Sequence, residues 1–107
     1  MKTGTVLICS IDDMPFIKHQ GIVINRGGKD LVAHCTPEAF NRYGGNIVIE
    51  PYERFIRGRK VIAIERTGAT YATIMDYVSK NVSRKFDSLA FNCFQFVHST
   101  SHPAASR

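Results

Sequence analysis

The sequence predicts an α+β fold: a small antiparallel sheet, barrel-like in its curvature, with helices packed on one side of it. Apolar residues follow the spacing typical of β-strands in the first half of the chain and the spacing typical of α-helices in the second half. An apolar fraction of 44% in 107 residues is typical of a globular protein. A chain of this length usually forms one domain, so we expect one over residues 1–100 and a flexible tail over 101–107.

Five segments have the length and composition of β-strands. They are rich in Val and Ile, and turn residues bound most of them. They cover residues 5–10, 19–25, 30–35, 46–50 and 60–65. The second and third segments are joined by NRGGKD, in which two glycines can adopt the positive φ of a tight hairpin. These two strands should therefore be antiparallel neighbours.

Two segments of the second half predict helices from their boundaries and spacing. In PYERFIRG, Pro51 suits the first helical position and Gly58 a helix stop, which predicts one short helix. From about Thr70 to Val82, apolar residues recur at helical spacing, which predicts a helix with one buried face. These apolar residues are Tyr71, Ile74, Met75, Val78 and Val82.

The segment SLAFNCFQFVHST, residues 88–100, predicts a third helix that starts with a cysteine. Asn92 can cap this helix, and Gln95 is placed to reach back to the cap in a capping box. Cys93 is then the first helical residue, where free backbone amides and the helix macrodipole favour a thiolate. A buried structural cysteine is the alternative, so the choice depends on a nearby base.

Four histidines are candidate bases for that cysteine. His98 lies five residues further along the same helix and points away from its N-terminal end, and His102 lies in the tail. His19 lies eight residues before Gly27 and His34 lies six residues after Gly28, so the hairpin should bring them close on adjacent strands. A cysteine facing two such histidines would combine a nucleophile, a base and an orienting group, as in acyl-transfer enzymes.

The same segments resemble the permuted papain-like (NlpC-type) hydrolases and acyltransferases, in the lecithin:retinol acyltransferase-like branch. The resemblance covers about residues 3–98, through TGTVLICS, HQGIVIN, VAHCT, RFIRGRKVIAIE and NCFQFV. It implies a permuted papain-like fold with Cys93 as nucleophile, His19 as general base and His34 as orienting residue. It also implies hydrolysis or acyl transfer on an amide or ester, from a peptide or an acyl-lipid, through a thioester and without a cofactor.

Two positions differ from the members of this branch that act on lipids. Gln20 stands where those members often have an aromatic residue, and Gly4-Thr5-Val6 replaces their usual opening Gly-Asp-Leu. We also expect no hydrophobic anchor after the domain. These differences argue against lipid acyl transfer and do not affect the three catalytic positions.

A zinc site is a second interpretation of the same side chains. His19, His34 and Cys93, together with Cys9 or Cys35, are all residue types that bind zinc. However, His34 and Cys35 are adjacent in a strand and should face opposite sides of the sheet. No pair of these residues has the spacing of a chelating turn, so we expect no metal.

The basic charge suggests a second function, that of a binding module with the same fold and no catalysis. Fourteen Lys and Arg against nine Asp and Glu give a net charge of +5. RFIRGRK (54–60) and the group Lys80, Arg84 and Lys85 could form a basic face for RNA or a protein partner. No aromatic platform is interleaved with these charges, so nucleic acid is not favoured as the partner.

Cysteine usage and hydropathy predict the compartment. Three cysteines without a CxxC spacing argue against a disulfide framework and favour a reducing compartment. The sequence has no evident targeting signal, and no apolar stretch approaches the ~20 residues that span a bilayer. We therefore expect a soluble cytoplasmic protein without a transmembrane segment, and the sequence does not indicate its oligomeric state.

Overall fold

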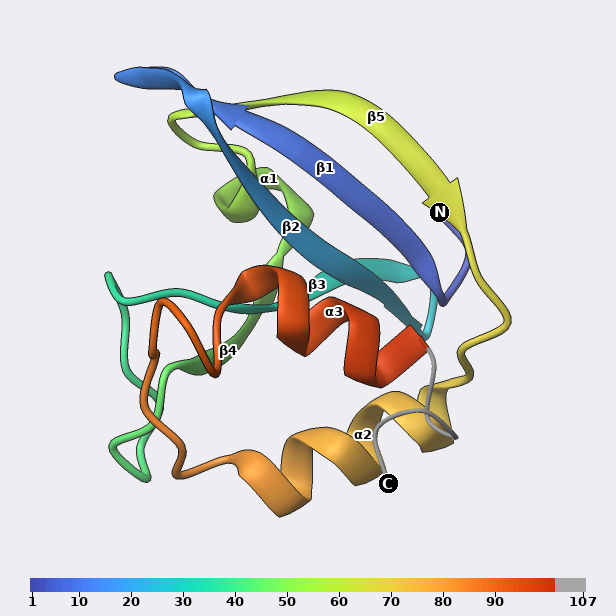
Figure 1. Cartoon of the computed structure of the whole chain (residues 1–107). Coiled ribbons are helices and arrows are strands. Elements are labelled where there is room, and N and C mark those ends of the chain that lie inside the picture. The colour runs from blue at the N-terminus through green and yellow to red at the C-terminus, as the bar shows by residue number, and fades with distance from the viewer. Residues whose placement is uncertain (102–107) are drawn as a thin grey trace.

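The chain forms a five-stranded antiparallel sheet with three helices over residues 1–101, which a computed structural model describes apart from the Pro15 side chain (Figure 1). The strands are β1 (Thr5–Ile11), β2 (Met14–Arg26), β3 (Lys29–Cys35), β4 (Ile47–Pro51) and β5 (Arg59–Arg66). The helices are α1 (Tyr52–Phe55), α2 (Tyr71–Asn81) and α3 (Cys93–Ser101). The predicted α+β class with an antiparallel sheet is confirmed.

Three boundaries differ from the expectation. β2 begins at Met14 because it continues into a tight connection with β1, where Ile11 pairs with Met14. Pro51 ends β4 in an extended conformation (φ −57°, ψ 147°) and caps α1 instead of starting it. Ser101, expected in the tail, ends α3, and residues 102–107, which include His102, lie outside the described part of the chain.

The strand order β4-β3-β2-β1-β5 places the predicted hairpin at the centre of the sheet. β2 and β3 are antiparallel, as expected, and their ladder runs from Arg26 and Lys29 at the turn to Ile22 and Ala33. Gly27 and Gly28 form this turn with φ of 59° and 84°. His19 and His34 lie beyond the last paired residues, where no ladder joins the two strands.

Each face of the sheet has its own core. On one face, Ile22, Ile24, Ala33 and Cys35 pack with Ile74 and Val78 of α2 and with Phe96 and Val97 of α3. On the other face, Leu7, Cys9, Val23 and Val32 surround Phe55 of α1. The expectation that all helices lie on one side is therefore wrong for α1 (Figure 1). The reason is that α1 connects the edge strands β4 and β5 and crosses the face that α2 and α3 leave uncovered.

Gly21 lies where Val32 and Phe55 leave no room for a side chain. A Cβ at this position would lie 2.5 Å from Cγ1 of Val32 and 2.9 Å from Cε1 of Phe55. We expect Gly21→Ala to lower the free energy of unfolding by about 1–3 kcal/mol, because overpacking displaces core neighbours. Gly68→Ala is the matched control, because its Cβ would meet nothing within 4 Å. Urea unfolding measures both variants, and equal stability of the two would contradict this packing.

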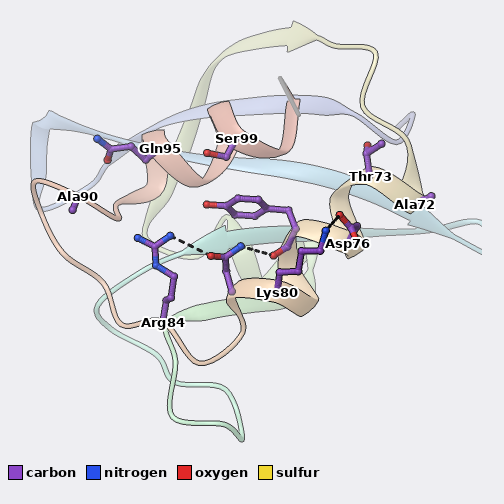
Figure 2. A pocket seen from close by; sticks show the side chains of 10 residues that line it. Ala72, Thr73, Asp76, Lys80, Arg84, Ala90, Gln95 and Ser99 are labelled. Atoms are coloured by element: carbon purple, nitrogen blue, oxygen red, sulfur yellow. Dashed lines mark hydrogen bonds and ion pairs between the residues drawn. The ribbon is translucent and has the colours of Figure 1, made fainter. Parts of the chain in front are cut away.

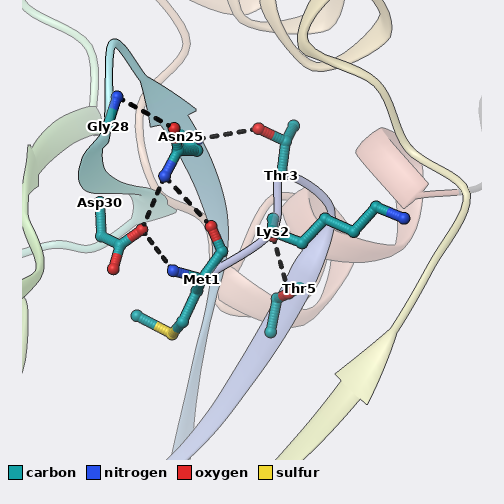
Figure 3. A network of polar contacts seen from close by, with 7 residues as sticks. All are labelled: Met1, Lys2, Thr3, Thr5, Asn25, Gly28 and Asp30. Atoms are coloured by element: carbon teal, nitrogen blue, oxygen red, sulfur yellow. Dashed lines mark hydrogen bonds and ion pairs between the residues drawn. The ribbon is translucent and has the colours of Figure 1, made fainter.

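The N-terminal residues hold the start of β3 to the end of β2 (Figure 3). The Met1 ammonium lies 2.7 Å from Oδ1 of Asp30, and Nδ2 of Asn25 donates to the same oxygen at 3.1 Å. The backbone N–H of Asn25 donates to the Thr3 hydroxyl at 2.8 Å. The Met1 contact, with a smaller contribution from Asn25, holds the pKa of Asp30 below its usual value. These contacts brace the hairpin that carries both histidines.

Candidate active site

His19 of β2 and His34 of β3 form a buried pair against α1. Nε2 of His19 lies 2.8 Å from Nδ1 of His34, and the two rings meet edge to face with centroids 5.0 Å apart. Both rings also contact Phe55, at centroid distances of 5.8 Å for His19 and 4.9 Å for His34. The side chains are 7% and 1% exposed. The hairpin thus brings together the two histidines that the sequence analysis selected.

Glu50 of β4 extends the pair to three polar groups on three neighbouring strands. Its Oε2 is hydrogen-bonded to Nε2 of His34. Glu50 is the register partner of Val32, which lies two residues from His34 and therefore on the same face of β3. Glu50 is not among the site residues that the sequence predicts. The available signal was one acidic residue at the end of an otherwise apolar strand.

Both imidazoles are uncharged at neutral pH. Burial lowers the pKa of His19 to about 3, with further contributions from His34 and from the positive charge of Arg59. Burial and Arg59 also lower the pKa of His34 to about 3, while its contact with the Glu50 carboxylate acts in the opposite direction. Arg59 is held in place by the Phe55 ring, 5.1 Å from its guanidinium carbon, and by the Phe55 carbonyl. An uncharged imidazole keeps the lone pair that a base requires, but a pKa of about 3 makes it a weak base at neutral pH, so the forming thiolate must raise the pKa of His19 for the proton to stay there.

The second ring nitrogen of His19, Nδ1, is the nitrogen of the histidine pair that can act as a base. It makes no hydrogen bond to any described residue. Across the described part of the chain, no buried side-chain nitrogen or oxygen lacks a partner. Nδ1 must therefore reach solvent, although most of the ring is covered.

Cys93 begins α3, as the sequence predicts, and the expected capping box is present. The backbone N–H of Gln95 donates to Oδ1 of Asn92 at 3.0 Å, and the backbone N–H of Asn92 donates to Oε1 of Gln95 at 3.4 Å. Cys93 precedes the buried Phe96 and Val97 by three and four residues, so it lies on the same side of the helix. That side faces the sheet, because α3 packs against β2 and β3. The thiol is half-buried.

The structure does not join Cys93 to the histidine pair by a hydrogen bond. Among residues 1–101, no hydrogen bond links its sulfur to His19 or His34. Its electrostatic neighbour is Cys35, whose pKa is raised to about 12 by burial and by Cys93. Cys35 packs on the α2/α3 face, whereas His34 packs on Phe55. Cys35, the neighbour of Cys93, therefore lies on the opposite face of β3 from His34. The backbone of β3 separates it from the two imidazoles.

The zinc interpretation gains no support from the geometry. Within the described residues, no group of three His, Cys, Asp or Glu side chains could hold a metal ion. Cys9 also faces the Phe55 core, where burial raises its pKa to about 11. The thiols at Cys9 and Cys35 are therefore protonated core residues.

A polar groove of about 490 Å³ lies between α2 and α3, separate from the histidine pair (Figure 2). Lys80 is paired with Asp76 at 3.0 Å, and Arg84 donates to Asn81 at 3.2 Å. Gln95 lines the same groove from the first turn of α3, but Cys93 and the two histidines do not line it. The groove therefore contributes no residue to the candidate catalytic set.

Comparison with protein-family models, curated proteins and solved structures gives no match. The permuted papain-like resemblance therefore stays a prediction that rests on the motifs of the sequence. None of the helices within residues 1–101 is both long enough and apolar enough to cross a bilayer.

Proposed function

We propose that the protein is a cysteine-dependent hydrolase or acyltransferase with a permuted papain-like fold, acting on an amide or ester. The observation that supports this most is the hydrogen-bonded chain His19–His34–Glu50, which leaves Nδ1 of His19 without a hydrogen bond to any described residue. The helix packed against the same two strands begins with Cys93. A base, an orienting chain and a thiol at a helix start are the parts that acyl transfer requires.

The reaction runs through a thioester on Cys93. Its sulfur attacks the substrate carbonyl carbon while Nδ1 of His19 takes the thiol proton. The tetrahedral intermediate then expels the amine or alcohol, which takes that proton from His19. Water or a second acceptor attacks the thioester with His19 again as base, which releases the product and restores the thiol. The backbone N–H of Cys93 is a donor for the oxyanion.

Nucleophile and base meet, in this proposal, where the central ladder ends. The ladder between β2 and β3 stops at Ile22 and Ala33, so no backbone pairing joins β2 to β3 beside His19, which is paired with Cys9 of β1 on its other side. Helix α3 packs against these two strands. Catalytic hydrogen bonds are often long or poorly aligned before a substrate is bound, so in this proposal the contact forms transiently in the free protein and tightens when substrate binds.

Thiol alkylation tests the pairing of nucleophile and base without a known substrate. We expect iodoacetamide at about pH 6 to label Cys93 well before Cys9 and Cys35, which are buried and protonated. This order follows from exposure alone, so the decisive comparison is His19→Ala. Without the base that takes its proton, Cys93 should be labelled on the order of tenfold more slowly or worse. Peptide mapping by mass spectrometry gives the rate at each cysteine.

His98→Ala is the matched control for this experiment. His98 lies on α3 like the thiol and stacks on Phe94 at a centroid distance of 6.2 Å, so its loss also removes an imidazole and a ring contact. Its substitution should leave the labelling rate of Cys93 unchanged. An unchanged rate in His19→Ala would refute the proposed base, and equal slowing by both variants would indicate a general effect on α3.

A further inference from the structure

Glu50 ends the hydrogen-bonded chain, and its chemistry determines which ring nitrogens carry protons. We propose that Glu50 is a positioning residue that holds His19 and His34 in the tautomer with the proton on Nε2, which leaves Nδ1 of His19 as a lone pair. The catalytic consequence rests on the proposed function. The tautomers themselves exist, and can be measured, whether or not Cys93 reacts.

The carboxylate of Glu50 determines the first proton position of the chain. An ionised carboxylate can only accept hydrogen bonds, so the contact between Oε2 of Glu50 and Nε2 of His34 requires a proton on that nitrogen. Glu50 keeps 18% of its side chain exposed, whereas His34 is 1% exposed. His34 in the middle of the chain therefore lies in the core, whereas Glu50 at one end and Nδ1 of His19 at the other reach solvent.

The proton positions then follow along the chain. An uncharged imidazole has one N–H, so with Nε2 of His34 protonated its Nδ1 must be an acceptor. Nδ1 of His34 lies 2.8 Å from Nε2 of His19, so Nε2 of His19 must be the donor of this hydrogen bond. Nδ1 of His19 is left with a lone pair. The burial that keeps both rings uncharged supports this order.

The opposite order of donors and acceptors keeps the same hydrogen bonds but leaves His19 without an unprotonated nitrogen that could act as a base. If Nδ1 of His34 donated to Nε2 of His19, the proton of His19 would lie on Nδ1, where the thiol proton must go. A glutamine at position 50 would permit this, because its amide can donate to Nε2 of His34 as well as accept from it. The negative charge of Glu50, more than its size, therefore selects the working tautomer.

Long-range ¹H–¹⁵N NMR of ¹⁵N-histidine-labelled protein at about pH 7 measures the tautomers directly, because protonated and bare ring nitrogens differ strongly in shift. We expect both rings to carry the proton on Nε2 in the wild type. Glu50→Gln should transfer a measurable share of both rings to the tautomer protonated on Nδ1. Glu53→Gln, which neutralises an exposed carboxylate on the neighbouring α1, should leave the wild-type pattern.

Either of two results overturns the inference. One is a wild-type spectrum with a proton on Nδ1 of His19 or His34, and this result stands even if Glu50→Gln does not fold. The other is a folded Glu50→Gln protein whose two tautomers match the wild type. Failure of the proposed function looks different, because an unreactive Cys93 with both rings protonated on Nε2 would refute the enzyme and retain the role of Glu50.

Discussion

Replacing Cys93 with serine is expected to remove ester hydrolysis almost completely, with kcat/KM lowered by at least about 10³-fold. Serine keeps the size of the side chain and its place beside the capping pair Asn92 and Gln95, so the fold should persist. Its hydroxyl is a much weaker acid than a thiol and is a poor nucleophile with the same base. p-Nitrophenyl acyl esters of several chain lengths provide the assay, and urea unfolding checks the fold.

The two histidine variants should rank differently in the same assay. His19→Ala removes the proton acceptor and should approach the loss seen in Cys93→Ser. His34→Gln should be milder, because Nδ1 of His19 remains and only its orientation is released. His98→Gln is the control and should match the wild type.

Two outcomes would contradict this assignment. If Cys93→Ser matched the wild type on every ester that the wild type hydrolyses, Cys93 would not be the nucleophile. If the wild type hydrolysed none of the esters and bound RNA in a salt-dependent manner, the binding module would become the better description. The basic residues Lys80 and Arg84 would then be the first to substitute.

The elements of this fold were predictable because their signals are local. The hairpin between β2 and β3 follows from Gly27 and Gly28, which have the positive φ that its turn requires. The start of α3 follows from Asn92 and Gln95, which form the capping box in the structure. Each of these signals involves residues only a few positions apart, and the fold is consistent with all of them.

The rest of the candidate site depends on contacts between residues far apart in the chain. Nothing in the eleven residues between β3 and β4 indicates that these strands pair, so the sequence could not place Glu50 beside His34. The position of α1 depends on which face of the sheet α2 and α3 leave open. The low pKa of His19 arises from burial under Phe55, which periodicity does not reveal. These tertiary contacts determine the proton positions on which the proposed chemistry depends.

The same burial should make the protein sensitive to mild acid. The pKa of each buried imidazole is about 3 in the folded protein and 6.5 when exposed, so the unfolded chain binds up to two more protons between these values. Stability is therefore complete above about pH 6.5 and falls as the pH decreases toward 3. The expected slope approaches about 2.7 kcal/mol per pH unit, or about 1.4 for each histidine.

Urea unfolding between about pH 7 and 4.5 measures this slope. The lower limit avoids the range in which Asp30 and Asp87 titrate, because both have pKa values below 3.8. His34→Gln should reduce the slope to about half, because one titrating group is gone and the other stays buried. His98→Gln leaves both buried rings in place and should keep the full slope.

The slope also tests the chemistry of the candidate site. A slope close to zero in the wild type would mean that the imidazoles are already charged in the folded protein at about pH 6. His19 could not then act as the initial base, since both of its ring nitrogens would carry protons. A steep slope that His34→Gln halves would instead establish two neutral rings at the pH of the labelling and hydrolysis assays. Nδ1 of His19 would then carry the lone pair that the proton of Cys93 requires, and the charge of the forming thiolate would have to raise its pKa for the transfer.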